Sequence, residues 1–180
     1  MLFGLLVFAA IVVVLFSLAA TYNSLVAAAE QTTRAWNNLD AVLHQRHDEI
    51  PALIEMCEPH LKSARAAFDK VREARAVSLN ARQTRDAEAL ARAERGLRAD
   101  LAALIAAAAS HPVLGASPAF ALLRQRNATL DKEIAERQAV YNEAVREYNA
   151  AIRRIPARII ATLTGFAPLE PLDADVAPPR

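Results

Sequence analysis

The chain has 180 residues, enough for a membrane segment and one domain but not for two domains. Its formal net charge is +1 with both signs interspersed, so it lacks the concentrated basic face of a nucleic-acid-binding protein, and the single cysteine, Cys57, excludes an internal disulfide. Ala, Leu, Arg, Glu and Gln dominate the sequence after residue 21. These residues favour helices, and no alternating β-type pattern occurs, so we predict an all-α fold.

The first 20 residues carry no charge, and Ser17 is their only polar side chain. As a helix they reach about 30 Å, which is the thickness of the hydrocarbon layer. A cleaved signal peptide is the alternative, with Ser17-Leu18-Ala19 as its cleavage site. A signal peptide begins with basic residues, however, and the first basic residue here is Arg34. We therefore predict a retained transmembrane anchor over residues 1–21.

Basic residues lie only on the C-terminal side of this anchor, beginning with Arg34 and Arg46. Because positively charged flanks stay in the cytoplasm, the pattern favours a single-pass protein whose remaining part faces the cytoplasm.

Four apolar stripes with helical spacing follow the anchor and predict four helices, each with one buried face. The stripes run through Tyr22, Leu25, Ala29, Trp36, Leu39, Leu43, Ile50 and Ile54; through Leu61, Phe68, Val71 and Leu79; through Leu90, Leu97, Leu101, Leu104 and Ile105; and through Phe120, Leu123, Leu130, Ile134, Tyr141, Val145, Tyr148, Ile152 and Ile155.

Proline and glycine predict where these helices begin and end. We expect a loop over residues 111–116, then a helix with Ser117 as its N-cap and Pro118 at its first position. Pro156 kinks or ends that helix. Gly165 is suited to the end of a short final helix.

Pro51 and Pro59 interrupt the first soluble helix, so the chain either reverses near them or continues as a kinked rod. Residues 30–60 are mainly acidic, whereas residues 61–85 and 118–158 are mainly basic. An acidic first helix between two basic helices favours reversal.

We therefore predict an elongated antiparallel four-helix bundle over residues 22–167. The segment 168–180 contains four prolines and has little periodicity, so we expect it to be disordered.

Two stretches of the sequence carry a family resemblance. They comprise Tyr22-Asn23-Ser24-Leu25-Val26, Ala35-Trp36, Leu39-Asp40, Leu43, Arg46 and Ile50-Pro51, and then Glu133-Ile134-Ala135, Tyr141-Asn142, Ala144-Val145, Tyr148-Asn149, Ile152-Arg153-Arg154, Pro156 and Gly165-Phe166. With them the chain resembles the LemA family of bacterial membrane proteins over most of residues 1–168. The resemblance implies an N-terminal anchor, an elongated antiparallel bundle inside the cell, and no catalytic residues. Ala52, Pro59 and residues 115–118 depart from the family pattern.

The Tyr-Asn pairs are candidates for a surface that binds a partner. They comprise Tyr22-Asn23, Tyr141-Asn142 and Tyr148-Asn149. The alternative is that the rings belong to the core and only their hydroxyl groups reach its edge. If the first and fourth helices are antiparallel, Tyr22 and Tyr148 lie at the same height and form one aromatic cluster near the membrane.

The same geometry returns the end of the fourth helix to the membrane. We expect a basic and apolar element there that contacts the lipid surface, formed by Arg153, Arg154, Arg158, Ile159 and Phe166. The alternative is that the apolar residues cap the core and the arginines are solvated.

Arg137 lies on the apolar stripe of the fourth helix, between Ile134 and Tyr141. A buried arginine requires a carboxylate, and Asp40 on the first stripe is the expected partner. The alternative is that Arg137 extends outward along its aliphatic stem.

These patterns predict a non-enzymatic, membrane-anchored protein that binds other proteins or organises an assembly at the bacterial cytoplasmic membrane. The alternatives are an accessory subunit of a membrane enzyme such as a protease, and a remodelling protein that binds the lipid surface. No residues combine nucleophile, base and oxyanion stabiliser, and we expect no cofactor or metal. The expected partners are the lipid bilayer and a protein of unknown identity, and a homo-oligomer is also compatible with the sequence.

Overall fold

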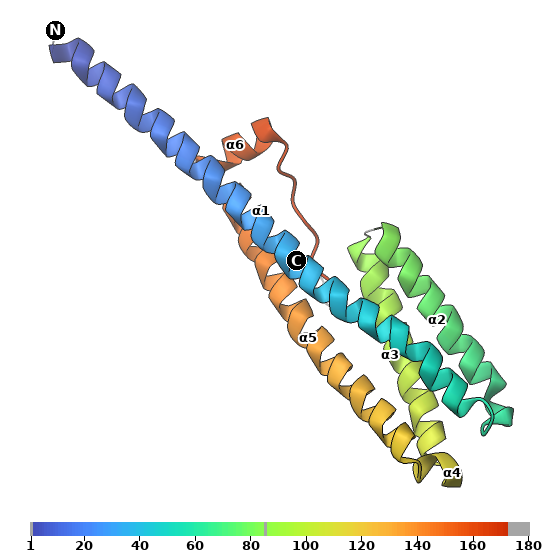
Figure 1. Ribbon diagram of the computed structural model, residues 1–180. Helices are drawn as coiled ribbons and strands as arrows, with labels where there is room; N and C mark the ends of the chain where they lie inside the picture. Colours follow the sequence, from blue (N-terminus) through green and yellow to red (C-terminus); the bar gives the residue numbers. More distant parts are fainter. Residues whose placement is uncertain (1, 85, 173–180) are drawn as a thin grey trace, which may run out of the picture.

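The computed structural model describes residues 2–84 and 86–172, and these residues form helices and turns but no strand. The elements are α1 (Leu2–Cys57), the short 3-10 helix η1 (Lys62–Ala64), α2 (Arg65–Thr84), α3 (Ala87–Ala109), α4 (Pro112–Gly115), α5 (Pro118–Arg153) and α6 (Ala157–Thr164). The predicted all-α class is confirmed, and Figure 1 shows that α1 extends far beyond the other helices at its N-terminal end.

α1 is one unbroken helix of 56 residues with two different parts. Its apolar N-terminal part touches no other helix and is long and apolar enough to cross a membrane, as judged by length and composition. From Leu25 onward, buried or half-buried side chains recur every three or four residues along α1. The apolar part and the packed part are therefore joined without a flexible linker.

The buried side chains form three groups along the length of the molecule. The group farthest from the N-terminus draws on α1, α2, α3, α4 and α5 and includes Cys57, Phe68, Leu104, Leu114 and Phe120. The middle group includes Leu39, Leu90 and Val145, and the group nearest the apolar part of α1 joins α1, α5 and α6. Among the described helices, only α1 and α5 contribute to all three groups. These two helices therefore connect the three groups along the length of the molecule.

The chain reverses after Cys57, and α2 runs back along α1. Glu58 pairs with Arg72 near the start of α2, and Asp40 pairs with Arg82 near its end. On the other side, Glu49 of α1 pairs with Arg126 of α5. The acidic character of α1 thus matches basic residues on α2 and α5, which is the pairing that the charge pattern predicted.

Pro51 lies inside α1 and does not end it. Proline has no N–H, so the carbonyl of His47, four residues earlier, loses its helical hydrogen bond. The Nε of Arg75 on α2 donates to that carbonyl at 2.9 Å. A residue of the neighbouring helix therefore compensates for the proline.

Local signals mark most helix ends correctly. Ser117 caps α5 by accepting from the N–H of Phe120, and Gly165 ends α6 with a φ of 80°. The segment 111–116, expected to be a loop, includes one helical turn, α4, because Pro112 occupies the first helical position, where a missing N–H costs nothing.

The expected disorder from residue 168 onward is wrong for residues 168–172. Leu172 is buried in the middle core group, and the backbone of this segment is hydrogen-bonded to α5. Proline-rich composition did not reveal these tertiary bonds. Residues 173–180 lie outside the described residues.

Candidate functional site

The two Tyr-Asn pairs of α5 bind the C-terminal segment of the same chain, residues 167–172, which we call the strap. The hydroxyl groups of Tyr148 and Tyr141 donate to the carbonyls of Ala167 and Glu170, at 3.0 and 3.4 Å. Asn149 both donates to the carbonyl of Leu169, at 2.7 Å, and accepts from its N–H, at 3.0 Å. The strap is therefore recognised through its backbone.

Asn142 continues this pattern two helical turns earlier. Its Oδ1 accepts from the N–H of Leu172 at 2.7 Å, and Gln138 donates to the carbonyl of the same residue at 2.8 Å. Seven residues of helix span about 10.5 Å, and three residues of extended chain span about 10 Å. Asn142 and Asn149 thus match the spacing of Leu172 and Leu169.

Most residues of the predicted partner surface are therefore occupied by the strap of the same chain. Tyr141, Asn142 and Tyr148 are buried, Asn149 is half-buried, and all four contact the strap rather than an open face. Burial raises the pKa of the Tyr141 and Tyr148 hydroxyls, which remain protonated donors. Only the third pair, Tyr22 and Asn23, is exposed.

An aromatic cluster joins α1, α5 and the end of α6, as expected. The ring of Phe166 lies 6.2 Å from that of Tyr22 and 6.5 Å from that of Tyr148, measured between centroids. Tyr22 and Tyr148 are therefore at the same height, and Phe166 lies between them. Edge-to-face contacts at these distances are favourable.

α6 packs on α1 just beyond the apolar part of that helix. Ala157, Ile160 and Ala161 are buried in one group with Leu25 of α1, and the strap holds the other end of α6. The remaining predicted membrane-contact residues, Arg153, Arg154, Arg158 and Ile159, are exposed, whereas Phe166 is half-buried. Figure 1 shows that α6 turns away from the direction of α1 and α5.

A buried charged network occupies the middle of the packed helices. Arg46 of α1 is only 1% exposed. Its guanidinium pairs with Glu94 of α3 and, at 3.1 Å, with Asp131 of α5. Burial lowers the pKa of Arg46, while Asp131 opposes that shift. One side chain thus connects three helices.

His47 extends the network to α2. Its Nε2 lies 3.1 Å from Glu94 and 3.2 Å from the hydroxyl of Ser78. Burial, followed by the positive charge of Arg46, lowers the pKa of His47 to about 4. The imidazole is therefore neutral at pH 7, and its contact with Glu94 is a hydrogen bond rather than an ion pair.

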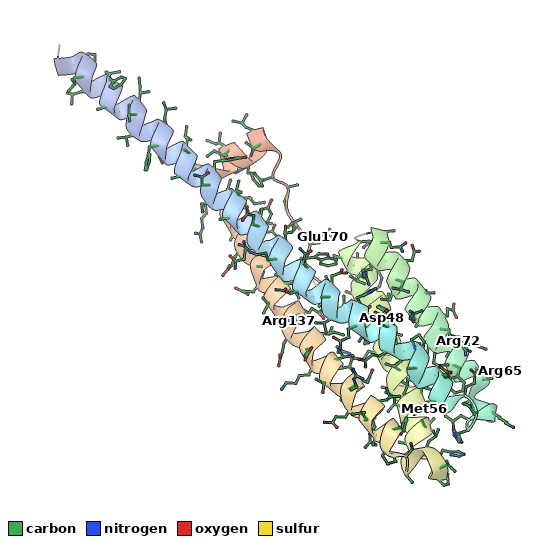
Figure 2. All side chains as sticks on the ribbon, in the orientation of Figure 1. Asp48, Met56, Arg65, Arg72, Arg137 and Glu170 are labelled. Atoms are coloured by element: carbon green, nitrogen blue, oxygen red, sulfur yellow. The ribbon has the colours of Figure 1, made fainter. Side chains whose placement is uncertain are left out.

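The predicted ion pair between Asp40 and Arg137 is wrong. Asp40 pairs with Arg82 at 2.8 Å, and Arg137 is exposed on the outer side of α5 (Figure 2). The apolar stripe of α5 passes from Ile134 to Tyr141 through Gln138, which turns Arg137 outward. Arg46 is the buried arginine instead, and the gap between Leu43 and Ile50 in the first stripe was its signal.

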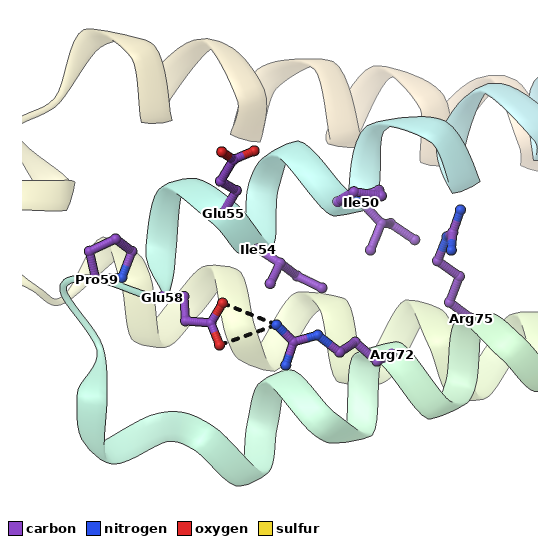
Figure 3. A pocket seen from close by; sticks show the side chains of 8 residues that line it. Ile50, Ile54, Glu55, Glu58, Pro59, Arg72 and Arg75 are labelled. Carbon is purple, nitrogen blue, oxygen red and sulfur yellow. Dashed lines mark hydrogen bonds and ion pairs between the residues drawn. The ribbon is translucent and has the colours of Figure 1, made fainter.

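A groove with a volume of about 590 Å³ lies between α1 and α2 (Figure 3). It is at the end of the molecule away from the apolar part of α1 (Figure 1). Ile50, Ile54, Pro51 and Pro59 supply its apolar surface. Its charged residues are Glu55, Glu58, Arg72 and Arg75, of which Glu58 and Arg72 pair at 3.1 Å. The groove therefore offers apolar contacts beside both signs of charge.

Together these features define an all-helical protein with one long apolar N-terminal helix, a buried charge network and a C-terminal strap. The family model for the LemA family matches residues 35–178, which is most of the chain. The chain belongs to the LemA family, as its Tyr-Asn, Arg-Arg and Gly-Phe motifs indicated. The search of curated proteins finds no match.

Proposed function

We propose that this protein is a non-enzymatic scaffold, anchored by residues 1–21 in the bacterial cytoplasmic membrane, that binds protein partners on an elongated antiparallel four-helix bundle in the cytoplasm. The observation that carries the proposal is the continuity of α1. A helix without a linker transmits the position of the anchor to the bundle, so any bound partner is held at a fixed distance from the membrane.

The distribution of basic residues supports the proposed cytoplasmic side of the membrane for the bundle. The first basic residues after the anchor are Arg34 and Arg46. The positive-inside rule therefore favours a cytoplasmic bundle. Membership of the LemA family agrees with association with a membrane.

The groove between α1 and α2 is the surface that we propose for a protein partner. It is remote from the anchor, its prolines present rigid apolar edges, and Glu55 has no ion-pair partner among the described residues. Such a mixture of apolar contact and charge is typical of interfaces between proteins.

Photocrosslinking in cells tests this proposal. A photoreactive amino acid is placed at Glu55 in the groove, and at Asn80, exposed on α2, as the matched control. The full-length protein is then solubilised in detergent and purified. We expect a reproducible adduct with another protein from position 55 and not from position 80. Adducts only between copies of this chain would contradict a scaffold for other proteins.

The identity of the adduct also tests the second candidate function. If position 55 crosslinks to a membrane enzyme, and the activity of that enzyme changes when this protein is absent, the protein is an accessory subunit of the enzyme rather than a general scaffold. Insertion is checked separately by replacing Leu6 and Val13 with arginine, which is expected to release the protein from carbonate-washed membranes.

A further inference from the structure

We infer that the outward face of α6 lies on the surface of the same bilayer that holds the anchor, where its arginines contact anionic phospholipid headgroups. This inference rests on the proposed membrane anchor and adds a second, peripheral contact. It follows from the apolar exposure of α6, its charge, and its height relative to the anchor.

The outward face of α6 is apolar and uncovered. Ile159 and Leu163 are 59 and 81% exposed and lie four residues apart on this face, and Ile155, which is 81% exposed, lies just before the helix begins. The opposite face of the helix, with Ala157 and Ala161, is buried against α1 and α5. α6 is therefore apolar on both faces, although only one face has a partner within the chain.

The charge around this face suits an anionic surface. Between Glu147 and Glu170 the chain contains three arginines and no acidic residue. Arg153, Arg154 and Arg158 are exposed and form no ion pair within the described part of the chain. Arginines that flank an apolar helical face are the pattern of helices that lie in a membrane interface.

The height of α6 fits the headgroup layer. Leu25, on which α6 packs, is five residues beyond Ala20, which places it about 7.5 Å past the end of the apolar stretch. The headgroup region extends about 5–7 Å beyond the hydrocarbon on each side. Tyr22, whose ring contacts Phe166, lies between these levels, and tyrosine prefers this interface.

The strap explains why α6 stays at this height. Tyr148 and Asn149 bind the backbone of residues 167 and 169 directly after α6, so both ends of α6 are fixed to α5. A lipid surface is favoured over a second copy of the chain because the site is adjacent to the anchor and rich in unpaired arginine. A second copy is one outcome of the test.

The test uses the full-length chain with Cys57→Ala, reconstituted in vesicles that contain about one-third anionic phosphatidylglycerol. Single cysteines at Ile159 or Leu163 carry an environment-sensitive fluorophore. Position Val113 in α4, at the opposite end of the packed helices and 59% exposed, is the matched control, and Leu15 in the apolar part of α1 reports insertion.

We expect labels at 159 and 163 to be quenched by lipids brominated near the headgroup and to be shielded from aqueous iodide several-fold relative to position 113. Labels at 159 and 163 that behave like position 113, while position 15 is quenched by lipid, would overturn the inference but keep the anchor. No lipid quenching at position 15 would overturn both. Shielding from iodide without lipid quenching would assign the face to a second copy and also overturn the inference.

Charge provides an independent test. Replacing Arg153, Arg154 and Arg158 together with glutamine is expected to reduce the lipid quenching at position 159 several-fold in anionic vesicles. The control variant replaces three other exposed arginines, namely Arg65, Arg124 and Arg137. It is expected to leave the quenching unchanged, and an equal effect of both variants would overturn the role of the α6 arginines.

Discussion

Near residue 46, four helices meet around buried charges, whereas near residue 148 one helix, α5, binds an extended strap through uncharged side chains. In the first region, Arg46 must find carboxylates on two other helices, so the contact fixes the register of specific residues. In the second region, Asn149 and Asn142 bind backbone atoms, so the contact fixes a path of the chain whatever its side chains. The charged region therefore defines the fold, and the strap region defines the position of α6.

The largest expected difference between the two regions comes from Arg46. Arg46→Met leaves the half-buried Glu94 without a cation, while Asp131 keeps only the more exposed Arg98, at 3.4 Å. We expect a loss of about 3–5 kcal/mol in the free energy of unfolding. Thermal or urea unfolding followed by circular dichroism measures this loss.

The control is Arg137→Met at the exposed position on α5, with an expected change of less than about 0.5 kcal/mol. Adding Glu94→Gln to Arg46→Met removes the carboxylate that has lost its cation, keeps the pair of Asp131 with Arg98, and is expected to restore part of the stability. Equal effects of the two single variants would show that the network does not fix the register.

The second prediction concerns the pH dependence of stability, which we expect to arise from His47 in the charged region and not from the strap region. The pKa of His47 is about 4 in the folded protein and 6.5 in its ordinary state, so the unfolded chain binds the proton first as the pH falls. Stability is therefore full above pH 6.5, decreases between pH 6.5 and about 4, and loses about 3 kcal/mol over that window.

The measurement compares unfolding between pH 7.5 and 4.5 for the natural protein and for His47→Gln, so that the pH dependence common to both proteins cancels. The difference isolates His47, around which lie Arg46 and His44 of α1, Arg75, Ser78 and Arg82 of α2, and Glu94 of α3. Identical pH dependence of the two proteins would contradict a neutral buried imidazole.

Sequence reasoning was effective where the signal is local. The cap at Ser117 and the glycine end at Gly165 depend only on neighbouring residues, and both were predicted. The common height of Tyr22 and Tyr148 was also predicted, because the pairing of α1 with α5 determines the relative height of their residues, whereas the position of Phe166 between the two rings was not.

The partners of Arg46 and the strap were missed because both depend on long-range geometry. Glu94 and Asp131 are distant in sequence and lie among many other charged residues, so only the packing of α3 and α5 identifies them. The strap has no periodicity of its own, and its order comes from hydrogen bonds donated and accepted by α5.

The third prediction breaks the strap. Asn142→Ala together with Asn149→Ala removes the side chains that contact the backbone of Leu172 and Leu169, and we expect the strap to open at a cost of about 1–3 kcal/mol. Hydrogen exchange is the sensitive measurement. The amides of Leu169 and Leu172 should lose protection by about 10-fold or more, while α2 and α3 keep theirs.

The matched control is Asn80→Ala, an exposed asparagine on α2 whose side chain forms no hydrogen bond with the strap or the network among the described residues. It should leave the exchange of residues 167–172 unchanged. Unaltered protection in the double variant would mean that burial of Leu172, rather than the asparagines, holds the strap.

The smallest effect is expected from the ion pair between Asp40 and Arg82, which joins α1 to α2 at 2.8 Å but is partly exposed. Solvent screening limits such a pair to about 0–1 kcal/mol, so Arg82→Met should change stability by less than one third of the effect of Arg46→Met. Raising the salt concentration should reduce the effect of Arg82→Met further and leave that of Arg46→Met nearly unchanged, because buried charges are poorly screened. Unfolding of both variants in low and high salt measures this contrast. If Arg82→Met lowered stability as much as Arg46→Met, the partly exposed ion pair, rather than the buried network, would fix the register of α2.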